Sequence, residues 1–214
     1  MTKQYSTETD LKLRFGGVLE NPYVSKVHRH CLDGFKVAGL KEILKPFHFK
    51  SILDVGCGLG EYSHIRKGMY LGLDNSFPRV LFAQKQYKNC HFIQADAVNL
   101  PFKSNSFEAV LIANTAHHLS DEELLAGLEE IRRVTKKFIV IDDCIRTPGQ
   151  NWLSRYFYSL DRGTMFRTVP EFKKIFERFG DNKTIHQDTH LTFPGLYLHS
   201  VFVLEVFKSS KDVR

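Results

Sequence analysis

A short apolar run that ends in three glycines, over residues 51–60, constrains the fold more than any other part of the chain. Its first half is rich in β-branched side chains, which is typical of a buried strand. Gly56, Gly58 and Gly60 then follow at spacings of two. Because glycine lacks a Cβ, such a loop can adopt positive φ and let a ligand approach the backbone. A strand that leads into this loop indicates a polar or anionic ligand at the strand's carboxyl end.

The spacing of the glycines distinguishes between classes of ligand. A dinucleotide-binding loop has the pattern G-x-G-x-x-G, whose third glycine would fall at Glu61. The chain has that glycine at Gly60 instead, and Asp54 lies two residues before Gly56. This D-x-G-x-G-x-G pattern resembles the first motif of the class I S-adenosylmethionine-dependent methyltransferases. Taken by itself, this stretch also fits a tight strand-to-helix turn without a ligand.

The composition is that of an ordinary globular protein. Of the 214 residues, 43% are hydrophobic and 25% are charged, which suits one domain with a sizeable core. The net charge of +6 permits an anionic partner such as RNA, although the basic residues are scattered. The chain shows no signal-peptide pattern and no run of roughly 18 apolar residues, so we expect a cytoplasmic protein without a transmembrane segment. The cysteines are far apart in sequence, which predicts reduced thiols at Cys31, Cys57, Cys90 and Cys144.

Apolar runs alternate with helical patterns along the chain. This alternation predicts an α/β fold with a Rossmann-like, doubly wound sheet that carries helices on both faces. The resemblance to methyltransferases implies a seven-stranded, mostly parallel sheet whose last strand is antiparallel and lies between two parallel ones. The predicted strands are 51–55, 70–73, 90–95, 109–113, 138–142, 183–188 and 197–207.

Capping residues mark the predicted helices. Two capping boxes, at 120–123 and 168–171, predict helix starts, and Gly180 predicts the end of the second helix. Ser76 is the expected cap of another helix, which should run to about Lys88. The segment from 144 to 167 shows no clear pattern and is expected to be irregular.

We expect one methyltransferase domain over residues 1–214. Residues 1–48 are predicted to form an N-terminal helical cap, because apolar positions recur at helical spacing between 23 and 44. Residues 49–145 form the predicted cofactor-binding half. Residues 146–214 contain the predicted substrate-covering segment and the C-terminal strands.

Three aspartates lie in or just after three successive predicted strands. Asp74 ends the second strand, 20 residues beyond Asp54, and Asp96 follows the third strand. A carboxylate at the end of the second strand can accept hydrogen bonds from both ribose hydroxyls of a nucleoside. One nucleoside ligand lying across the strand ends explains the spacing. Taken singly, Asp74 could be a turn residue and Asp96 a loop carboxylate.

The resemblance to methyltransferases extends over roughly residues 50–145. The L-P-F at 100–102, followed by S-F-E at 106–108 and an apolar strand, is similar to small-molecule methyltransferases of the methyltransferase domain 11 type. Glu108 replaces the aspartate that is commoner there, and the link between Gly60 and Asp74 is shorter than in many members.

The resemblance implies S-adenosyl-L-methionine as the cofactor and S-adenosyl-L-homocysteine as its product. The glycine loop would hold the methionine portion and Asp74 the ribose, while Asp96 and the Ala97 N–H would contact the adenine. Asp54 would orient the loop or meet the ammonium group through water. The implied cofactor-binding residues are Asp54, Gly56, Cys57, Gly58, Gly60, Asp74, Asn75, Asp96, Ala97 and Asn114.

His117 and His118 follow the fourth predicted strand, where members of this family often carry two histidines beside the methyl donor. Either could contact the substrate or act as a general base, because histidine titrates near neutral pH. The aromatic and basic segment that follows the fifth strand is expected to cover the substrate, or else to seal the sheet. The candidate substrate residues are Trp152, Tyr156, Arg162 and Arg167. The sequence predicts no metal site, and the spacings of His28 and His30 and of His186 and His190 do not favour one.

The sequence therefore predicts a methyltransferase that acts on an O, N or C atom of a small molecule, such as a lipid-like, quinone or glycan precursor. RNA is the second candidate acceptor, on account of the positive charge. Three further functions fit the same pattern less well: a non-catalytic binding protein with this fold, a nicotinamide dehydrogenase and an aminopropyltransferase. The sequence predicts no oligomeric state.

Overall fold

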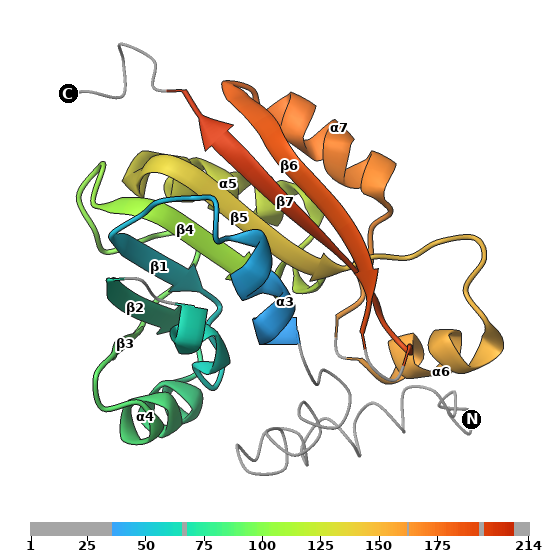
Figure 1. The fold of residues 1–214 in the computed structure, drawn as a ribbon, viewed down its shortest axis with the longest axis horizontal. Coiled ribbons are helices and arrows are strands. Elements are labelled where there is room, and N and C mark those ends of the chain that lie inside the picture. Colours follow the sequence, from blue (N-terminus) through green and yellow to red (C-terminus); the bar gives the residue numbers. More distant parts are fainter. Residues whose placement is uncertain (1–35, 66–67, 162, 193–194, 208–214) are drawn as a thin grey trace, which may run out of the picture.

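In a computed structural model of the chain, the described residues contain one seven-stranded sheet and the helices that pack on it (Figure 1). The structure describes residues 36–65, 68–161, 163–192 and 195–207. The strand order is β3-β2-β1-β4-β5-β7-β6. The strands are β1 (Ser51–Val55), β2 (Met69–Asp74), β3 (His91–Gln94), β4 (Phe107–Ala113), β5 (Thr135–Cys144), β6 (Asn182–Leu191) and β7 (Leu198–Val206).

The first five strands run parallel, and β7 is antiparallel to both of its neighbours. At the end of β1, Val55 pairs with Leu73 of β2 and with Ile112 of β4, so these strands end level with one another. On the other side of the sheet, β7 lies between β5 and β6. The predicted doubly wound sheet with an inserted antiparallel last strand is confirmed.

Two hydrophobic cores lie on opposite faces of the sheet, because successive strand side chains point to opposite sides. Leu53 and Val110 belong to the core beneath α5 (Asp121–Val134) and α7 (Val169–Phe179). Ile52 and Leu111 belong to the core beneath α3 (Lys36–Ile43), the 3-10 helix η1 (Glu61–Ile65) and α4 (Phe77–Gln86). The remaining helices are η2 (Ala116–His118) and α6 (Trp152–Leu160).

The capping boxes start helices where the sequence predicts them. The Ser120 hydroxyl accepts from the Glu123 N–H while the Glu123 carboxylate accepts from the Ser120 N–H, and the same exchange opens α7. Gly180 follows α7 with a positive φ of 61°. Ser76 occupies the cap position of α4 but makes no side-chain capping bond.

Several predicted boundaries are wrong, and one helix lies where none is predicted. The segment predicted to be irregular contains α6, which Asn151 caps by accepting from the Ser154 N–H. Aromatic residues are weak helix formers, which explains why the pattern does not reveal this helix. The helix α4 ends at Gln86 rather than near Lys88, and β5 and β6 are longer than predicted.

The predicted N-terminal cap lies almost entirely outside the described residues, which include only α3 from it. Within the described part of the chain, no helix has both the length and the apolar character needed to cross a membrane. Cys57, Cys90 and Cys144 are buried thiols, and Cys31 lies outside the described residues. The division into a single domain with three segments stays a prediction.

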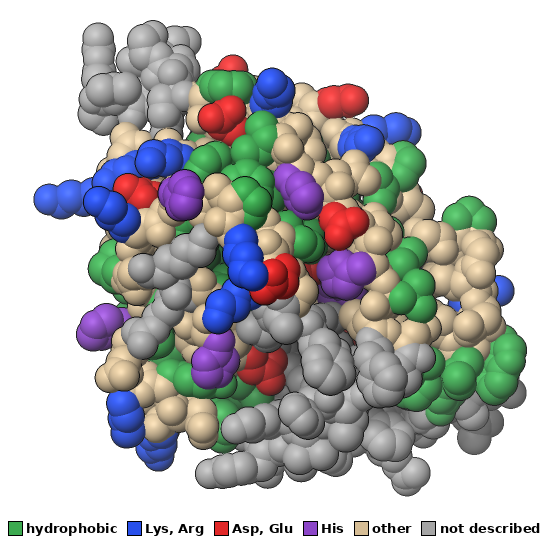
Figure 2. Space-filling view, viewed as in Figure 1, with side chains coloured by type: hydrophobic (Ala, Val, Ile, Leu, Met, Phe, Trp, Pro, Cys, Tyr) green, Lys and Arg blue, Asp and Glu red, His purple; other side chains and the backbone are tan. Residues whose placement is uncertain are grey.

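Apolar side chains of α6 lie at the surface. Trp152 and Tyr156 are exposed, and Leu153 is partly so. Figure 2 shows hydrophobic side chains in the region at the lower right where Figure 1 places α6. This helix follows β5, so it lies near the edge of the sheet at which the parallel strands end (Figure 1).

Candidate cofactor-binding and active site

The predicted site residues gather at the carboxyl edge of the parallel strands. The strand order reverses between β1 and β4. From β1 the chain continues to β2 and β3 on one side of the sheet, and it then returns to β4 and β5 on the other side. In open α/β sheets, ligands bind outside the carboxyl ends of the strands at such a reversal. The glycine loop leaves β1 at this point.

The glycine loop adopts the backbone conformation that its composition permits. Gly56, Gly58 and Gly60 have φ values of 77°, 53° and 80°. A Cβ on Gly56 would lie 2.3 Å from the Thr115 hydroxyl oxygen, so the loop lies directly against the residues that follow β4. The Cys57 side chain is buried in the core under α4, which leaves only its backbone for a ligand.

Asp74 joins the glycine loop to the end of β2. One carboxylate oxygen accepts from the Gly58 N–H at 2.9 Å, and the other accepts from the Ser76 N–H at 2.9 Å. An ionised carboxylate has about four acceptor positions, so two remain for further donors. This arrangement suits a carboxylate that receives two ribose hydroxyls.

Asp54 is fully buried within β1. Its carboxylate accepts a short hydrogen bond from the Tyr70 hydroxyl. Burial, and then the charge of Asp54, hold the pKa of Tyr70 well above its ordinary value, so this hydroxyl remains a donor. The arrangement fits an orienting role for Asp54.

Asp96 and Ala97 lie in the turn after β3, next to the end of β2. The exposed Asp96 carboxylate accepts from the Val98 N–H at 3.1 Å. The Gln94 side chain donates to the carbonyl oxygen of Asn75 at 2.9 Å, which ties this turn to the residue after Asp74. The two strand ends are thereby held side by side.

Asn114 directly follows β4, has a positive φ of 50° and joins a buried polar network. Its side-chain amide donates to the Tyr62 hydroxyl at 2.9 Å, and that hydroxyl lies 3.4 Å from an Asp142 carboxylate oxygen. The other Asp142 oxygen lies 3.0 Å from His199 Nδ1, and His199 Nε2 lies 3.0 Å from Cys144 Sγ. No pattern in the sequence indicates this network, because its members come from η1, from the residue after β4, from β5 and from β7.

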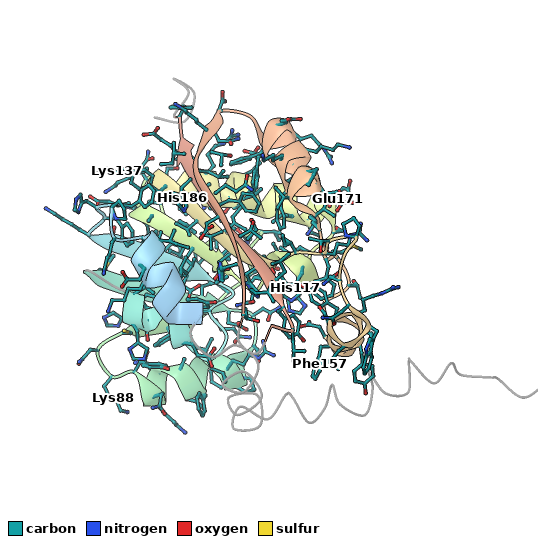
Figure 3. All side chains as sticks on the ribbon, turned by 45° about the vertical axis from the view of Figure 1, so that its right-hand side comes forward. Lys88, His117, Lys137, Phe157, Glu171 and His186 are labelled. Carbon is teal, nitrogen blue, oxygen red and sulfur yellow. The ribbon has the colours of Figure 1, made fainter. Side chains whose placement is uncertain are left out.

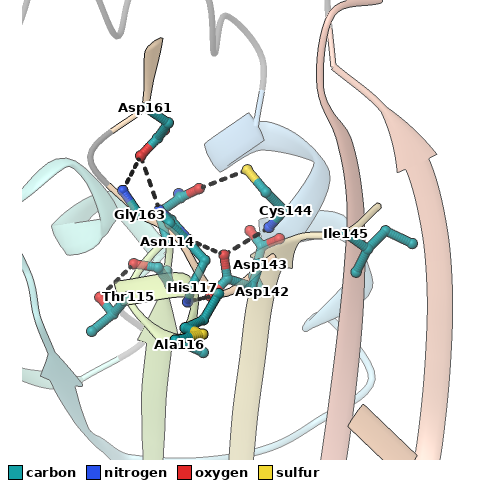
Figure 4. Close-up of polar contacts among 12 residues, drawn as sticks. Asn114, Thr115, Ala116, His117, Asp142, Asp143, Cys144, Ile145, Asp161 and Gly163 are labelled. Carbon is teal, nitrogen blue, oxygen red and sulfur yellow. Dashed lines mark hydrogen bonds and ion pairs between the residues drawn. The ribbon is translucent and has the colours of Figure 1, made fainter. Parts of the chain in front are cut away.

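His117 is buried between two carboxylates (Figure 4). Its Nδ1 lies 2.5 Å from Asp143 Oδ1, and its Nε2 lies 3.5 Å from Asp161 Oδ1. Burial alone would lower the pKa of His117, but the charges and hydrogen bonds of Asp143 and Asp161 raise it to about 10. Burial opposes ionisation of these two carboxyls as well, yet His117 brings the pKa of each below its ordinary value.

The two histidines therefore differ in what they can do. His117 carries a proton at neutral pH in this arrangement, so it is poorly suited to act as a general base. His118 is exposed, with its ring centroid 4.2 Å from that of His117. Figure 3 shows His117 on the side of the molecule where α6 carries Phe157, and far from Lys137 at the start of β5.

The predicted substrate residues lie in different environments. Trp152 and Tyr156 are exposed on α6. Arg162 lies outside the described residues. Arg167 is buried, and its guanidinium donates to the carbonyls of Ala116, Leu119 and Met165 and to the Asp121 carboxylate. This arrangement does not support the expectation that Arg167 contacts a substrate, because its donors hold the loop around η2.

A methyltransferase domain model matches residues 52–137 of the chain. This span includes the glycine loop, Asp74, Asp96 and both histidines, and the sheet around it has the seven-stranded order described above. This match and the fold support membership of the class I S-adenosylmethionine-dependent methyltransferase family. The cofactor of this family is S-adenosylmethionine. The finer resemblance, to the methyltransferase domain 11 type, stays a prediction.

Similar members of this family act on different acceptors. A demethylmenaquinone methyltransferase from Thermotoga maritima is 35% identical over 45% of this chain and 43% of its own length. A tRNA (carboxymethyluridine(34)-5-O)-methyltransferase from Saccharomyces cerevisiae is 30% identical over 71% of this chain and 53% of its own length. The chain thus spans about half the length of these two relatives.

The fold also matches that of a solved methyltransferase. The structure of a SAM-dependent methyltransferase from Aquifex aeolicus matches with a TM-score of 0.62 and 22% identity. The match covers 94% of this chain and 100% of that protein. At this level of identity the likeness concerns the fold.

Proposed function

We propose that this protein transfers the methyl group of S-adenosylmethionine to an acceptor held beside the carboxyl ends of β4 and β5. The observation that carries the proposal is the Asp74 carboxylate, which lies against Gly58 where the strand order of the sheet reverses. The glycine loop would hold the methionine portion and Asp74 the ribose. Asp96 and the Ala97 N–H would contact the adenine, and Asn114 would face the methyl donor.

Methyl transfer makes limited chemical demands on these residues. The sulfonium group already makes the methyl carbon electrophilic, so the protein must mainly align a nucleophile with it. Orientation of this kind can supply roughly 7–11 kcal/mol of the barrier. The carboxyl edge offers a rigid frame for it, because the buried network through Asn114 and Asp142 fixes the ends of β4 and β5.

We favour a small-molecule acceptor. The exposed aromatic side chains of Trp152 and Tyr156 on α6 support this choice, since they could cover an apolar or planar molecule at the carboxyl edge. A tRNA acceptor is the second candidate. The net charge of +6 and the yeast tRNA methyltransferase that matches 71% of the chain support it.

Calorimetric titration with S-adenosylmethionine and S-adenosylhomocysteine tests the proposal. We expect saturable binding of both by the wild-type protein. Candidate acceptors can then be screened by the release of S-adenosylhomocysteine. Binding without turnover on any acceptor would favour a non-catalytic binding protein. A folded protein that binds neither compound would contradict the proposal.

His118 is the histidine that we expect to contact the acceptor, because it is exposed and His117 is buried. If His118 accepts a proton from the acceptor, His118→Ala should lower turnover by at least about 100-fold and change the pH dependence of turnover. The pH dependence of turnover, compared with that of His91→Ala at an exposed position of β3, provides the measurement. An unchanged rate and pH profile would exclude His118 from this role.

A further inference from the structure

Three potential metal ligands meet at the carboxyl edge of the sheet. His117 and His118 belong to η2, and Asp161 lies directly after α6. Their ligand atoms all lie within 4.8 Å of one another. The chain thus brings together one carboxylate and two imidazoles, which are the ligand types that zinc and similar ions bind in proteins.

The spacing of two of these atoms already matches a metal site. Ligands about 2.0–2.1 Å from a tetrahedral zinc ion lie roughly 3.3–3.4 Å from each other. His117 Nε2 and Asp161 Oδ1 are 3.5 Å apart. The His118 ligand nitrogen lies within 4.8 Å of both of these atoms, and a movement of its exposed side chain would bring it to the same distance from an ion.

Asp143 fixes His117 in the orientation that metal binding requires. Its Oδ1 lies 2.5 Å from His117 Nδ1, and its Oδ2 accepts from the backbone N–H of His117 at 3.0 Å. With Nδ1 as a donor to Asp143, Nε2 is the nitrogen that faces Asp161 and His118. A carboxylate behind the imidazole is the usual outer partner of a metal-binding histidine.

Packing holds the His117 ring in place. Phe166 stacks on it with ring centroids 5.1 Å apart and an interplanar angle of 11°. On another side, the backbone of Gly163 lies so close that a Cβ there would fall 2.0 Å from His117 Cδ2. The Gly163 N–H also donates to Asp161 Oδ1 at 2.8 Å, which positions the carboxylate. A site whose ligands are held in this way is preorganised.

The charges of these groups also favour a divalent ion. Two carboxylates, Asp143 and Asp161, face one imidazole. A single proton on that imidazole balances one of their two negative charges, whereas a divalent cation on Nε2 balances both.

We propose that His117, His118 and Asp161 bind a divalent transition-metal ion of the zinc type. Three protein ligands leave a fourth position open, as in catalytic rather than structural zinc sites. The open position would suit a water molecule or a hydroxyl group of a ligand, whose pKa the ion would lower. With an ion bound, His118 is a ligand and not a base.

A second set of residues in the same region does not form a competing site. His117, Asp143 and Cys144 also have their ligand atoms within 4.8 Å of one another. However, Asp143 is already bonded to His117 Nδ1, and Cys144 Sγ lies 3.0 Å from His199 Nε2. An ion there would have to break both contacts.

Metal titration of the chelator-stripped protein tests the proposal without any cofactor or acceptor. We expect wild type to bind about one Zn²⁺ or Co²⁺ per chain, with the visible absorption of Co²⁺ in a low-symmetry site. Loss of a residue that only supports a metal ligand typically lowers metal affinity 10–100-fold. Loss of a ligand itself should cost more, so His118→Ala and Asp161→Asn should each lower the metal affinity by at least about 100-fold. His91→Ala, on the exposed surface of β3, should leave it unchanged.

The readout is independent of the proposed methyl transfer, so the two can fail separately. Circular dichroism should show that His118→Ala remains folded, because this side chain is exposed. Failure of the wild-type protein to bind either ion would overturn the proposal and leave His117 as a buried imidazolium. Equal binding by wild type, His118→Ala and Asp161→Asn would overturn it as well, by placing the ion elsewhere.

Discussion

Asp74→Ala is expected to lower the affinity for S-adenosylmethionine at least about 100-fold. A hydrogen bond to a charged group contributes about 1.5–3 kcal/mol, and the ribose would lose two of them. About 1.4 kcal/mol corresponds to a tenfold change in affinity. The substitution also removes the acceptor of the Gly58 and Ser76 N–H groups, which loosens the glycine loop. Calorimetric titration with both cofactor forms provides the measurement.

Two further variants separate the loss of a contact from a loss of folding. Asp74→Asn keeps the side-chain volume but places a donor opposite one of the N–H groups, so it should also weaken binding. Asp188→Ala removes an exposed carboxylate from β6, at the far edge of the sheet, and should bind like wild type. The affinity of Asp74→Ala for the cofactor could instead stay within about threefold of the wild-type affinity, a difference in binding free energy below about 0.7 kcal/mol. That result would show that the ribose is bound elsewhere.

Arg167→Met should destabilise the fold by about 3–5 kcal/mol. The guanidinium donates at 2.8 Å to the Ala116 carbonyl and at 2.7 Å to the Leu119 carbonyl, and it pairs with Asp121. Methionine fills much of the same volume but removes the guanidinium donor from the Leu119 carbonyl and leaves the Ala116 carbonyl with only the Leu119 N–H. The cost is about 1–3 kcal/mol for each group that loses its partner and stays buried. The denaturant midpoint, measured with an unchanged m-value, gives the free energy of unfolding.

Arg178→Met is the matched control for this change. Arg178 is half exposed on α7 and lies 3.9 Å from Glu122, so it forms a surface ion pair. Such pairs contribute about 0–1 kcal/mol. If Arg167→Met were no more destabilising than Arg178→Met, the loop around η2 would not depend on the buried guanidinium.

The cofactor half of the fold could be predicted because its signals are local. The three glycines, the apolar run before them and the aspartate at the end of β2 all lie within residues 51–74, and each reflects a requirement of the backbone at that position. The capping boxes of α5 and α7 are equally local, since a cap and its partner are three residues apart. The structure confirms these elements with small shifts at their ends.

The surroundings of the histidines could not be predicted, because their partners are distant in sequence. Asp143 is 26 residues from His117, and no spacing rule joins one residue after β4 to another in β5. Asp161 comes from a segment whose pattern indicates no regular element. The aromatic residues near Arg167 in the sequence suggest that Arg167 contacts a substrate. Only the fold shows that its guanidinium holds the loop around η2.

The position of β7 has a consequence for how this sheet is assembled during synthesis. Of the seven strands it comes last in the sequence, yet it lies between β5 and β6. When a nascent chain has emerged from the ribosome only as far as β6, this strand therefore has no neighbouring strand in the sheet with which to pair. His199, on β7, is also absent from the Asp142 and Cys144 contacts until that moment. The insertion of β7 into the sheet and the completion of the polar network through Asp142 and His199 thus become one late event in the folding of the nascent chain.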